Sequence, residues 1–203
     1  MIKKLKFILL FLSLAICLCL MSNTYSRYVA DTKGSIDVLF AKWQILVNSH
    51  DITNNTNSTI TIVPVIEEND HIASNVMAPT SKGYFDIEID PTNVDVSFRY
   101  AINLEMENEN IPDLLITKYA ILPDSYVEGA SLDTTNLTGT VITNTLVFDK
   151  NTPSFKFNAF TIRIFFEWYN GDGRTMTDEE DTEIGASDET FKINTNISFE
   201  QYL

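Results

Sequence analysis

The sequence predicts an all-β protein: a single jelly-roll-like antiparallel β-sandwich of about eight or nine strands that follows an N-terminal signal peptide helix. Two observations carry this prediction. Several segments alternate apolar and polar residues with a period of two, which places one face of a strand on a core and the other in water. Beyond the N-terminal apolar run, no segment keeps a helical period over three turns. The predicted domains are residues 1–26, the signal peptide, and residues 27–203, the β-sandwich.

The N-terminus has the composition of a secretory signal peptide. Three lysines precede an apolar run from Phe7 to Met21, and polar residues follow. Cleavage is expected near Ser26, because Thr24 and Ser26 suit the two positions that signal peptidases read before the cut. The alternative is an uncleaved anchor, although a membrane span needs roughly 20 apolar residues. In either case, contact with the membrane is expected only through this segment.

The positions of the cysteines and the net charge indicate a domain without disulfides that does not bind nucleic acids. Both cysteines, Cys17 and Cys19, lie in the apolar run, so the processed chain contains none. A secreted domain without disulfides has to be stabilised by its core, and roughly 175 residues suffice for one full-sized core. The net charge is −14, and removal of the leading lysines makes the processed form more acidic still. Such a surface repels phosphate backbones, so nucleic-acid binding is not expected.

The first strand candidates follow a polar arm. A strand is expected from Ile36 to Val47, with a β-bulge near Ala41 and Lys42 because the apolar phase changes there. Two separate short strands are the alternative. A loop rich in Asn, Thr and Ser covers residues 48–59, and another strand is expected from Ile60 to Ile66.

The longest alternating pattern, Ser81 to Glu105, predicts a β-hairpin with its turn at Pro91–Asn93. The inward residues would be Phe85, Ile87 and Ile89 in the first strand, and Val94, Val96, Phe98, Tyr100, Ile102 and Leu104 in the second. An isolated hairpin is only marginally stable in water, so the rest of the chain has to cover its apolar face.

Four further strands are predicted after this pattern. Residues 114–122 lie between two prolines, and residues 140–148 are β-branched and suit an edge or connecting strand. Residues 159–169 and 190–202 alternate most clearly. Between these two, residues 170–188 read as a Gly-rich acidic loop.

The acidic loop contains the one candidate cation site in the sequence, and it is a weak one. The candidate ligands are Asp172, Asp178, Glu179, Glu180 and Asp181. Trp168 stands where a calcium loop needs its first carboxylate, and the flanks are predicted strands rather than helices. A solvated loop without a metal is the favoured interpretation, and no cofactor is expected.

No catalytic constellation is visible. His50 and His71 are the only histidines, and neither belongs to a His-Glu-x-x-His zinc motif. The sequence contains no Gly-x-Ser-x-Gly elbow, phosphate loop or dinucleotide fingerprint. Asp86 and Glu88 share a strand face, as a glycosidase acid pair would, but the polar half of an amphipathic strand explains them equally well. The sequence therefore favours a protein that is not an enzyme.

Four segments carry a resemblance to a known family: residues 24–28, 40–48, 78–87 and 181–185. They resemble exported proteins of Gram-positive bacteria in the camelysin and TasA family, which depend on a SipW-type signal peptidase. The resemblance implies a jelly-roll domain, export to the cell surface or biofilm matrix, and a structural role in matrix fibres. Members have also been described as metalloproteases, but no zinc motif here supports that activity.

The resemblance also implies a mode of assembly. In fibres of this family, an N-terminal strand of one subunit completes the sheet of its neighbour, a natural use of an exposed strand edge. The candidate assembly strand runs from Tyr28 to Phe40 and includes Ile36 and Val38. An ordinary first strand of its own domain is the alternative.

The expected partners are other copies of the chain or other matrix and cell-surface proteins, together with the signal peptidase during export. The alternative function is a monomeric binding or adhesion module of the cell surface. Its ligand would contact the aromatic residues Phe165 and Tyr169 if these are exposed, although a neighbouring loop could equally cover them.

Overall fold

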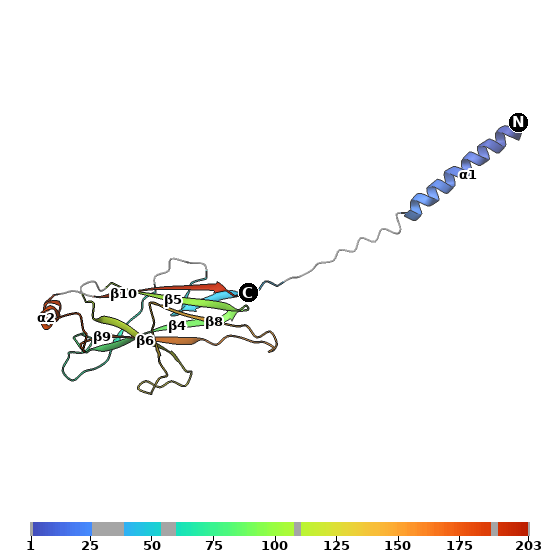
Figure 1. Cartoon of the computed structure of the whole chain (residues 1–203). Helices are drawn as coiled ribbons and strands as arrows, with labels where there is room; N and C mark the ends of the chain where they lie inside the picture. The colour runs from blue at the N-terminus through green and yellow to red at the C-terminus, as the bar shows by residue number, and fades with distance from the viewer. Residues whose placement is uncertain (1, 26–38, 54–59, 108–110, 188–190, 203) are drawn as a thin grey trace. The chain divides into compact units, whose positions relative to one another are not determined.

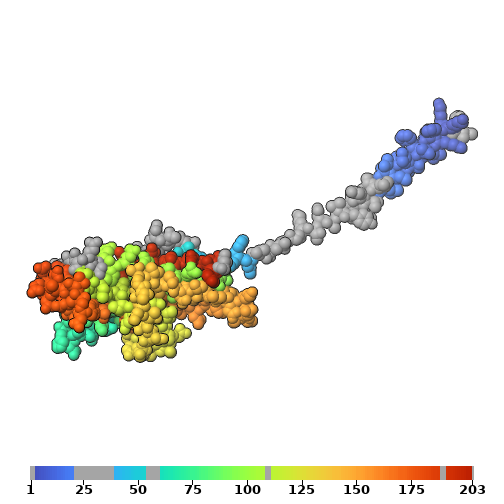
Figure 2. Space-filling model, viewed as in Figure 1, coloured from blue at the N-terminus to red at the C-terminus, as the bar shows by residue number. Residues whose placement is uncertain are grey.

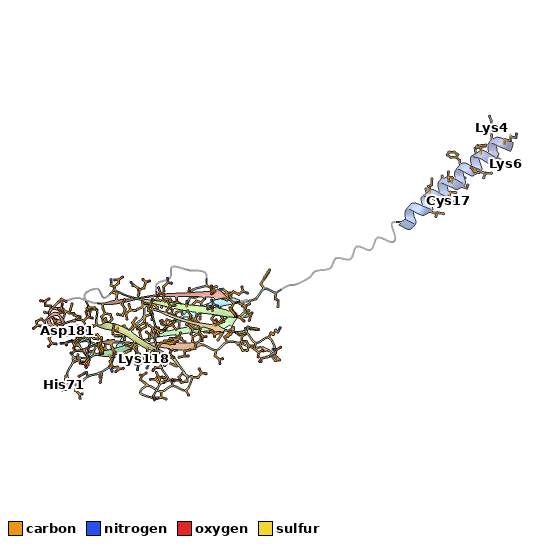
Figure 3. The ribbon with its side chains drawn as sticks, viewed as in Figure 1. Lys4, Lys6, Cys17, His71, Lys118 and Asp181 are labelled. Carbon is orange, nitrogen blue, oxygen red and sulfur yellow. The ribbon has the colours of Figure 1, made fainter. Side chains whose placement is uncertain are left out.

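The computed structural model divides the chain into a helical N-terminal unit, Met1–Phe40, and a compact β-rich unit, Ala41–Leu203 (Figure 1). It describes residues 2–25, 39–53, 60–107, 111–187 and 191–202. The helix α1, Ile2–Tyr25, covers most of the predicted signal segment and carries Cys17 (Figure 3). Within the described part of the chain, no helix has the length and hydropathy that crossing a membrane requires. The expected cleavage point at Ser26 and the predicted assembly-strand residues Tyr28, Ile36 and Val38 lie outside the described residues.

The described residues of the β-rich unit form ten strands and one helix. Their bounds are β1 Trp43–Val47, β2 His50–Asp51, β3 Val65–Ile66, β4 Lys82–Val94, β5 Phe98–Glu107, β6 Leu114–Leu122, β7 Thr135–Asn136, β8 Val141–Leu146, β9 Phe160–Trp168, α2 Asp178–Ala186 and β10 Lys192–Gln201. The predicted strands at 114–122, 159–169 and 190–202 are confirmed as β6, β9 and β10. The segment predicted as an edge or connecting strand at 140–148 is β8, which lies at the edge of its sheet.

The strands form two antiparallel sheets. The larger has the order β2-β1-β4-β9-β6-β7, with β3 paired to β4, and the smaller has the order β10-β5-β8. From β4 onward, each long strand lies in the opposite sheet from the long strand before it. Strand partners are consequently far apart in sequence; for example, the Arg99 side chain on β5 donates a hydrogen bond to Glu200 on β10, 101 positions later.

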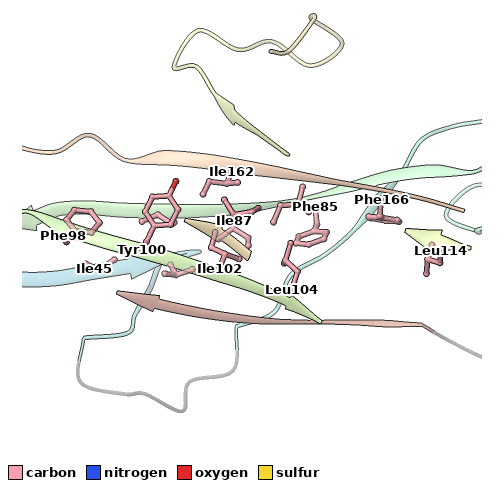
Figure 4. Close-up of a cluster of buried hydrophobic side chains, with 14 of the residues drawn as sticks. Ile45, Phe85, Ile87, Phe98, Tyr100, Ile102, Leu104, Leu114, Ile162 and Phe166 are labelled. Carbon is pink, nitrogen blue, oxygen red and sulfur yellow. The ribbon is translucent and has the colours of Figure 1, made fainter. Parts of the chain in front are cut away.

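The inward faces of the two sheets form one hydrophobic core, so the arrangement is sandwich-like (Figure 4). The larger sheet contributes residues such as Ile45, Ile87 and Ile162, and the smaller sheet contributes Tyr100 and Ile102; each of these is at most 2% exposed. The period-two pattern correctly predicted which face of these strands is buried. The all-β prediction is confirmed at this level.

The predicted hairpin between residues 81 and 105 is wrong, although both of its strands exist. β4 continues through Pro91 and pairs with β1 and β9, whereas β5 pairs with β8 and β10 in the other sheet. Opposite Ile45 of β1, β4 contains two residues, Pro91 and Thr92, which is the signature of a β-bulge. Such an irregularity tolerates proline, which cannot donate a ladder hydrogen bond. Residues 91–93 therefore have the composition of a turn, although they lie at a bulge within β4.

The strand predicted from Ile36 to Val47 is shorter in its described part. β1 begins at Trp43, and the bulge expected near Ala41 and Lys42 is absent from that position, because neither residue belongs to a strand. Leu39 and Phe40 are 96% and 91% exposed. Likewise, only the last two residues of the strand predicted from Ile60 to Ile66 pair, as β3.

The loop predicted at residues 170–188 contains the helix α2, which forms one end of the β-rich unit (Figure 2). Thr177 caps the helix: its Oγ1 accepts a hydrogen bond from the backbone N–H of Glu180 at 3.3 Å, and its own N–H donates to Glu180 Oε2 at 2.7 Å. This is a capping box, and Thr-x-x-Glu is its sequence signature. The prediction of a continuous loop overlooked this signal because the helix is too short to show a clear period.

A buried carboxylate anchors the segment that leads into α2. Asp113 accepts hydrogen bonds from the backbone N–H groups of Thr175 and Met176 at 2.7 to 2.9 Å. Burial raises the pKa of the Asp113 carboxyl, but the hydrogen bonds from Met176 and Thr175 outweigh it and hold that pKa below its usual value. The ionised form of Asp113 therefore stabilises this end of the fold.

Candidate functional site

The site with the clearest capacity for binding is the outer edge of β10. β10 pairs with β5 along its whole length, from Lys192 opposite Glu107 to Gln201 opposite Phe98. Among the strands that the structure describes, none pairs with its other edge. An edge strand of this kind presents a row of unpaired backbone N–H and C=O groups, which is a template for a further strand.

Burial changes abruptly between β5 and β10. The inward residues of β5, such as Phe98, Ile102 and Leu104, are at most 1% exposed. The inward residues of β10 alternate as predicted, yet they are only half-buried: Phe191 just before the strand, and Ile193, Thr195, Ile197 and Phe199 within it. The same alternation of apolar and polar residues is thus found in both strands, but the inward side chains are fully buried in β5 and remain partly exposed in β10.

A cavity of about 740 Å³ lies along residues 193–199 of β10. Its wall on β10 includes Ile197 and Phe199, and the facing wall includes Trp43 and Ile45 of β1 together with Ile60. It is therefore a gap between the two sheets, at the side where the smaller sheet ends.

A second cavity of about 1050 Å³ lies along the N-terminal half of β10. Its lining is mainly apolar and includes Met77, Phe85, Trp168, Ile184 and Phe191. Ile62 and residues 193–195 line both cavities. The two cavities therefore adjoin along β10, and we refer to them together as the β10 groove.

Two polar atoms at the β10 groove lack partners. Thr195 Oγ1 and Trp168 Nε1 are buried, and neither has a hydrogen-bond partner among the described residues. Leaving a buried donor or acceptor unpaired costs about 1–3 kcal/mol. Thr195 is also the only polar residue in the inward stripe from Phe191 to Phe199. Chemically, the groove offers backbone pairing along one edge, apolar space for alternate side chains and one hydroxyl at its middle, a combination suited to an extended peptide.

The predicted cation residues are not grouped around a common point. Arg174 pairs with Asp178, whose Oδ1 lies 2.7 Å from Arg174 Nη2, and with Asp181 at 4.0 Å (Figure 3 labels Asp181). Asp172 and Glu179 are exposed, and Glu180 belongs to the capping box. In the described ranges, no three Asp, Glu, His or Cys side chains are placed so that they could hold a metal ion together.

The residues considered for catalysis are also dispersed. His50 lies on β2 and His71, labelled in Figure 3, lies in a turn after β3; both are exposed. Asp86 accepts hydrogen bonds from Arg163 Nε at 2.8 Å and Nη2 at 2.9 Å, whereas Glu88 is exposed. Asp86 is thus paired with a cation rather than with a second carboxyl, which does not fit the glycosidase arrangement.

Arg163 is the buried centre of an ionic cluster that the sequence pattern did not predict; its two carboxylate partners, Asp86 and Glu128, are partly exposed. It is 5% exposed on the outer face of β9, and its guanidinium lies 3.7 Å from the ring centre of Tyr84. Arg163 Nη1 also donates to Glu128 at 2.9 and 3.0 Å. The hydrogen bonds from Arg163 hold the pKa of the Glu128 carboxyl below its usual range. Alternation identified Arg163 only as an outward residue; its burial depends on the loop of Glu128, which folds over the sheet.

The two aromatic residues of the binding-module alternative are half-buried and have partners within the chain. The Phe165 ring packs near Tyr84, and Lys118 Nζ lies 5.1 Å from its ring centre. The hydroxyl of Tyr169 donates to the backbone carbonyl of Asp172 at 2.9 Å. They therefore do not form an open aromatic patch.

No protein-family model, curated protein sequence or solved structure matches this chain.

Proposed function

We propose that this protein is an exported structural subunit of the cell envelope or biofilm matrix, which assembles by strand addition at the β10 groove. The observation that carries the proposal is the free edge of β10 beside two adjoining apolar cavities. A strand added there would pair its backbone with β10 and cover the half-buried residues of its inward face. It would thereby extend the smaller sheet and close the core.

The proposed occupant is the segment from Tyr28 to Phe40 of a neighbouring copy. Ile36, Val38 and Phe40 share one phase, as the inward residues of a strand do. The segment would extend over about 43 Å, enough to cover β10, which is about 33 Å long at the same rise per residue. Leu39 and Phe40 are large apolar residues that are almost fully exposed, and burial in a neighbour's groove would remove them from water.

The remaining parts of the proposal follow from the sequence. We expect cleavage of the signal segment near Ser26, location outside the cell, and partners that are other copies or other matrix and cell-surface proteins. We further propose that the sandwich is of jelly-roll type, because successive long strands pass from one sheet to the other. Neither an enzymatic activity nor a cofactor is part of this proposal.

The test is the assembly state of the protein exported by a Gram-positive host. Intact mass identifies the N-terminus, and light scattering with electron microscopy follows assembly against concentration. We expect a processed chain that forms concentration-dependent fibres. Deletion of residues 28–40 should abolish the fibres, and a synthetic peptide of residues 28–40 should bind the deleted protein whereas a scrambled peptide should not.

A strictly monomeric, processed protein at high concentration would refute the assembly proposal. The β10 groove would then be assigned to the alternative, a binding module of the cell surface, whose ligand would be an extended peptide from another protein. A protein that retains residues 1–26 would instead be a membrane-anchored surface protein.

A further inference from the structure

We infer that two copies of the chain form a dimer through the free edges of their β10 strands, which pair antiparallel to each other and are centred on Thr195. The inference goes beyond the proposed function, because it concerns the subunit before any strand is added and holds whether or not fibres form. Three observations support it: the sequence of β10, the direction of its free backbone groups, and the unpaired hydroxyl of Thr195.

The sequence of β10 reads nearly the same in both directions from Thr195. Residues 191–199 are Phe-Lys-Ile-Asn-Thr-Asn-Ile-Ser-Phe. An antiparallel copy aligned at Thr195 therefore places chemically like residues opposite each other. The pairs are Phe191 with Phe199, Ile193 with Ile197, and Asn194 with Asn196. A two-fold symmetric contact needs such self-complementarity, because the same strand forms both sides of it.

The backbone groups that β10 leaves unpaired among the described strands belong to the residues that this alignment needs. In an antiparallel pair, successive residues direct their N–H and C=O groups alternately toward one neighbour and the other. Tyr202 N–H donates to the carbonyl of Ser97 at 2.9 Å, at the end of the pairing between β10 and β5. The even-numbered residues of β10 therefore direct these groups at β5, and the odd-numbered residues direct theirs at the free edge. Two copies of Thr195 can thus exchange both N–H···O=C bonds across the two-fold axis.

The hydroxyl of Thr195 selects the register. Its buried Oγ1 has no hydrogen-bond partner among the described residues. Directly opposed residues of an antiparallel pair lie on the same face, so rotation about the Cα–Cβ bond lets the hydroxyls of two opposed threonines bond to each other. The two nearest registers that keep the same backbone groups paired would place Thr195 opposite Ile193 or Ile197. In both, the hydroxyl would face an apolar side chain.

The paired stretch also carries little charge, in contrast to the rest of the chain. Lys192 is the only charged residue between Phe191 and Phe199, and it would lie opposite Ser198. A chain with a net charge of −14 repels its own copies, so a nearly uncharged edge is a surface on which two copies can approach each other. Pairing would also remove part of the half-buried inward face of β10 from water.

The dimer and the added strand of the proposed function use the same edge and exclude each other. In the dimer, the two three-stranded sheets join in the order β8-β5-β10-β10-β5-β8. A symmetric contact of this kind closes on itself, so it stops at two copies. The dimer therefore protects the β10 edge from other strands, and strand addition requires the dimer to open.

Disulfide trapping in the exported full chain tests the register, in a background of Cys17→Ser and Cys19→Ser. Thr195→Cys alone should give a disulfide-linked dimer, because opposed residues of an antiparallel pair lie within reach of a disulfide. Ile193→Cys and Ile197→Cys should each fail alone, because each would lie about 13 Å from its own copy. A mixture of these two variants should be linked. Light scattering of the reduced proteins, below the concentration at which fibres form, should give twice the mass of the chain.

A matched pair of charge variants tests the contact without cysteines. Asn194 and Asn196 are exposed, and the proposed register places them opposite each other. Asn194→Lys with Asn196→Lys puts like charges opposite each other at two symmetric places, whereas Asn194→Lys with Asn196→Glu puts opposite charges there. Sedimentation equilibrium should give a dimer dissociation constant about tenfold higher for the first variant than for the second.

Three results would overturn this inference and leave the proposed function standing. They are a monomeric parent protein below the concentration at which fibres form, trapping of Thr195→Cys only in mixtures with Ile193→Cys or Ile197→Cys, and equal dissociation constants for the two charge variants. Trapping of Thr195→Cys in a protein that never forms fibres would support the dimer and refute the proposed function.

Discussion

Gly83 on β4 has almost no space for a side chain, and substitution by alanine should destabilise the fold. Gly83 lies between β3 and β9, opposite Ile66 on one side and Phe166 on the other. A Cβ atom at this position would lie 2.6 Å from Phe166 Cζ and 2.8 Å from the carbonyl oxygen of Val65. Carbon atoms attract each other best at about 3.5–4.0 Å, and a carbon and an oxygen atom at only a slightly shorter distance, so both contacts are repulsive.

The magnitude follows from two opposing effects. Overpacking a close-packed core costs about 1–3 kcal/mol, because the Phe166 ring and the β3 backbone have to move. Replacing glycine by alanine within a strand recovers about 0.5–1 kcal/mol of backbone entropy. The net loss in the free energy of unfolding is therefore about 1–2 kcal/mol. With a typical dependence on denaturant, this lowers the urea midpoint by roughly 0.5–1 M.

The assay is urea unfolding followed by the fluorescence of Trp43 and Trp168. Gly185→Ala in α2 is the matched control, because a Cβ there would meet nothing within 4 Å. That change should raise stability by up to about 1 kcal/mol, since alanine favours a helix more than glycine does. An unchanged or raised midpoint for Gly83→Ala would refute the packing argument. If the Phe166 ring causes the loss, Phe166→Leu should recover part of it in the double variant.

Three further variants test other parts of the fold. Thr80 occupies the third position of a turn after Pro79 with φ 79°, a conformation that favours glycine, so Thr80→Gly should raise the free energy of unfolding by about 0.5–1 kcal/mol in the same urea assay. Because the folded-state pKa of Asp113 lies below its usual 3.8, the stability that it contributes is present above that pH and is lost as pH falls through the folded pKa. The Asp113→Asn variant cannot lose this contribution, so its free energy of unfolding should fall less on acidification than that of the parent protein. If the two proteins lose stability equally as the pH falls, Asp113 does not stabilise the fold through its ionised form. Arg163→Met removes the contacts to two carboxylates, both partly exposed, and should cost about 1–2 kcal/mol. Limited proteolysis should then cut near Glu128 faster than in the parent, and unchanged cleavage would show that Arg163 does not hold this loop.

The alternation of apolar and polar residues predicted which face of a strand is buried more reliably than it predicted which strands pair with each other. The alternation in β5 and β9 identified buried residues such as Ile102 and Ile162, because each strand has one face on the core. It did not identify strand partners, since a period of two is the same whichever strand lies beside it. The pattern predicted a turn at Pro91–Asn93, whereas a bulge accommodates Pro91 within β4. Thr177 and Glu180 could have predicted the start of α2.

The β10 groove could be predicted only in part. Alternation correctly assigned Ile193 and Ile197 to an inward face, as it did for Ile102 on β5. The difference in burial between the two strands arises because, among the described strands, β5 lies between two neighbours and β10 has only one. A missing neighbour is a property of the whole sheet, and no pattern within one strand encodes it. The Arg163 cluster is similar, since its burial depends on a loop 35 positions away.

The passage of successive long strands between the two sheets has a kinetic consequence. Neither sheet can be completed from neighbouring segments, because β5 pairs with β10 at the end of the chain and β4 pairs with β9. Chains dominated by such distant pairings fold slowly, since loops have to close before the contacts form. If the chain is exported as proposed, β5 lacks its partner β10 until residues 192–201 have crossed the membrane. Under that proposal, the β10 edge can form only after β10 itself has been translocated, because its pairing with β5 is one of these distant contacts.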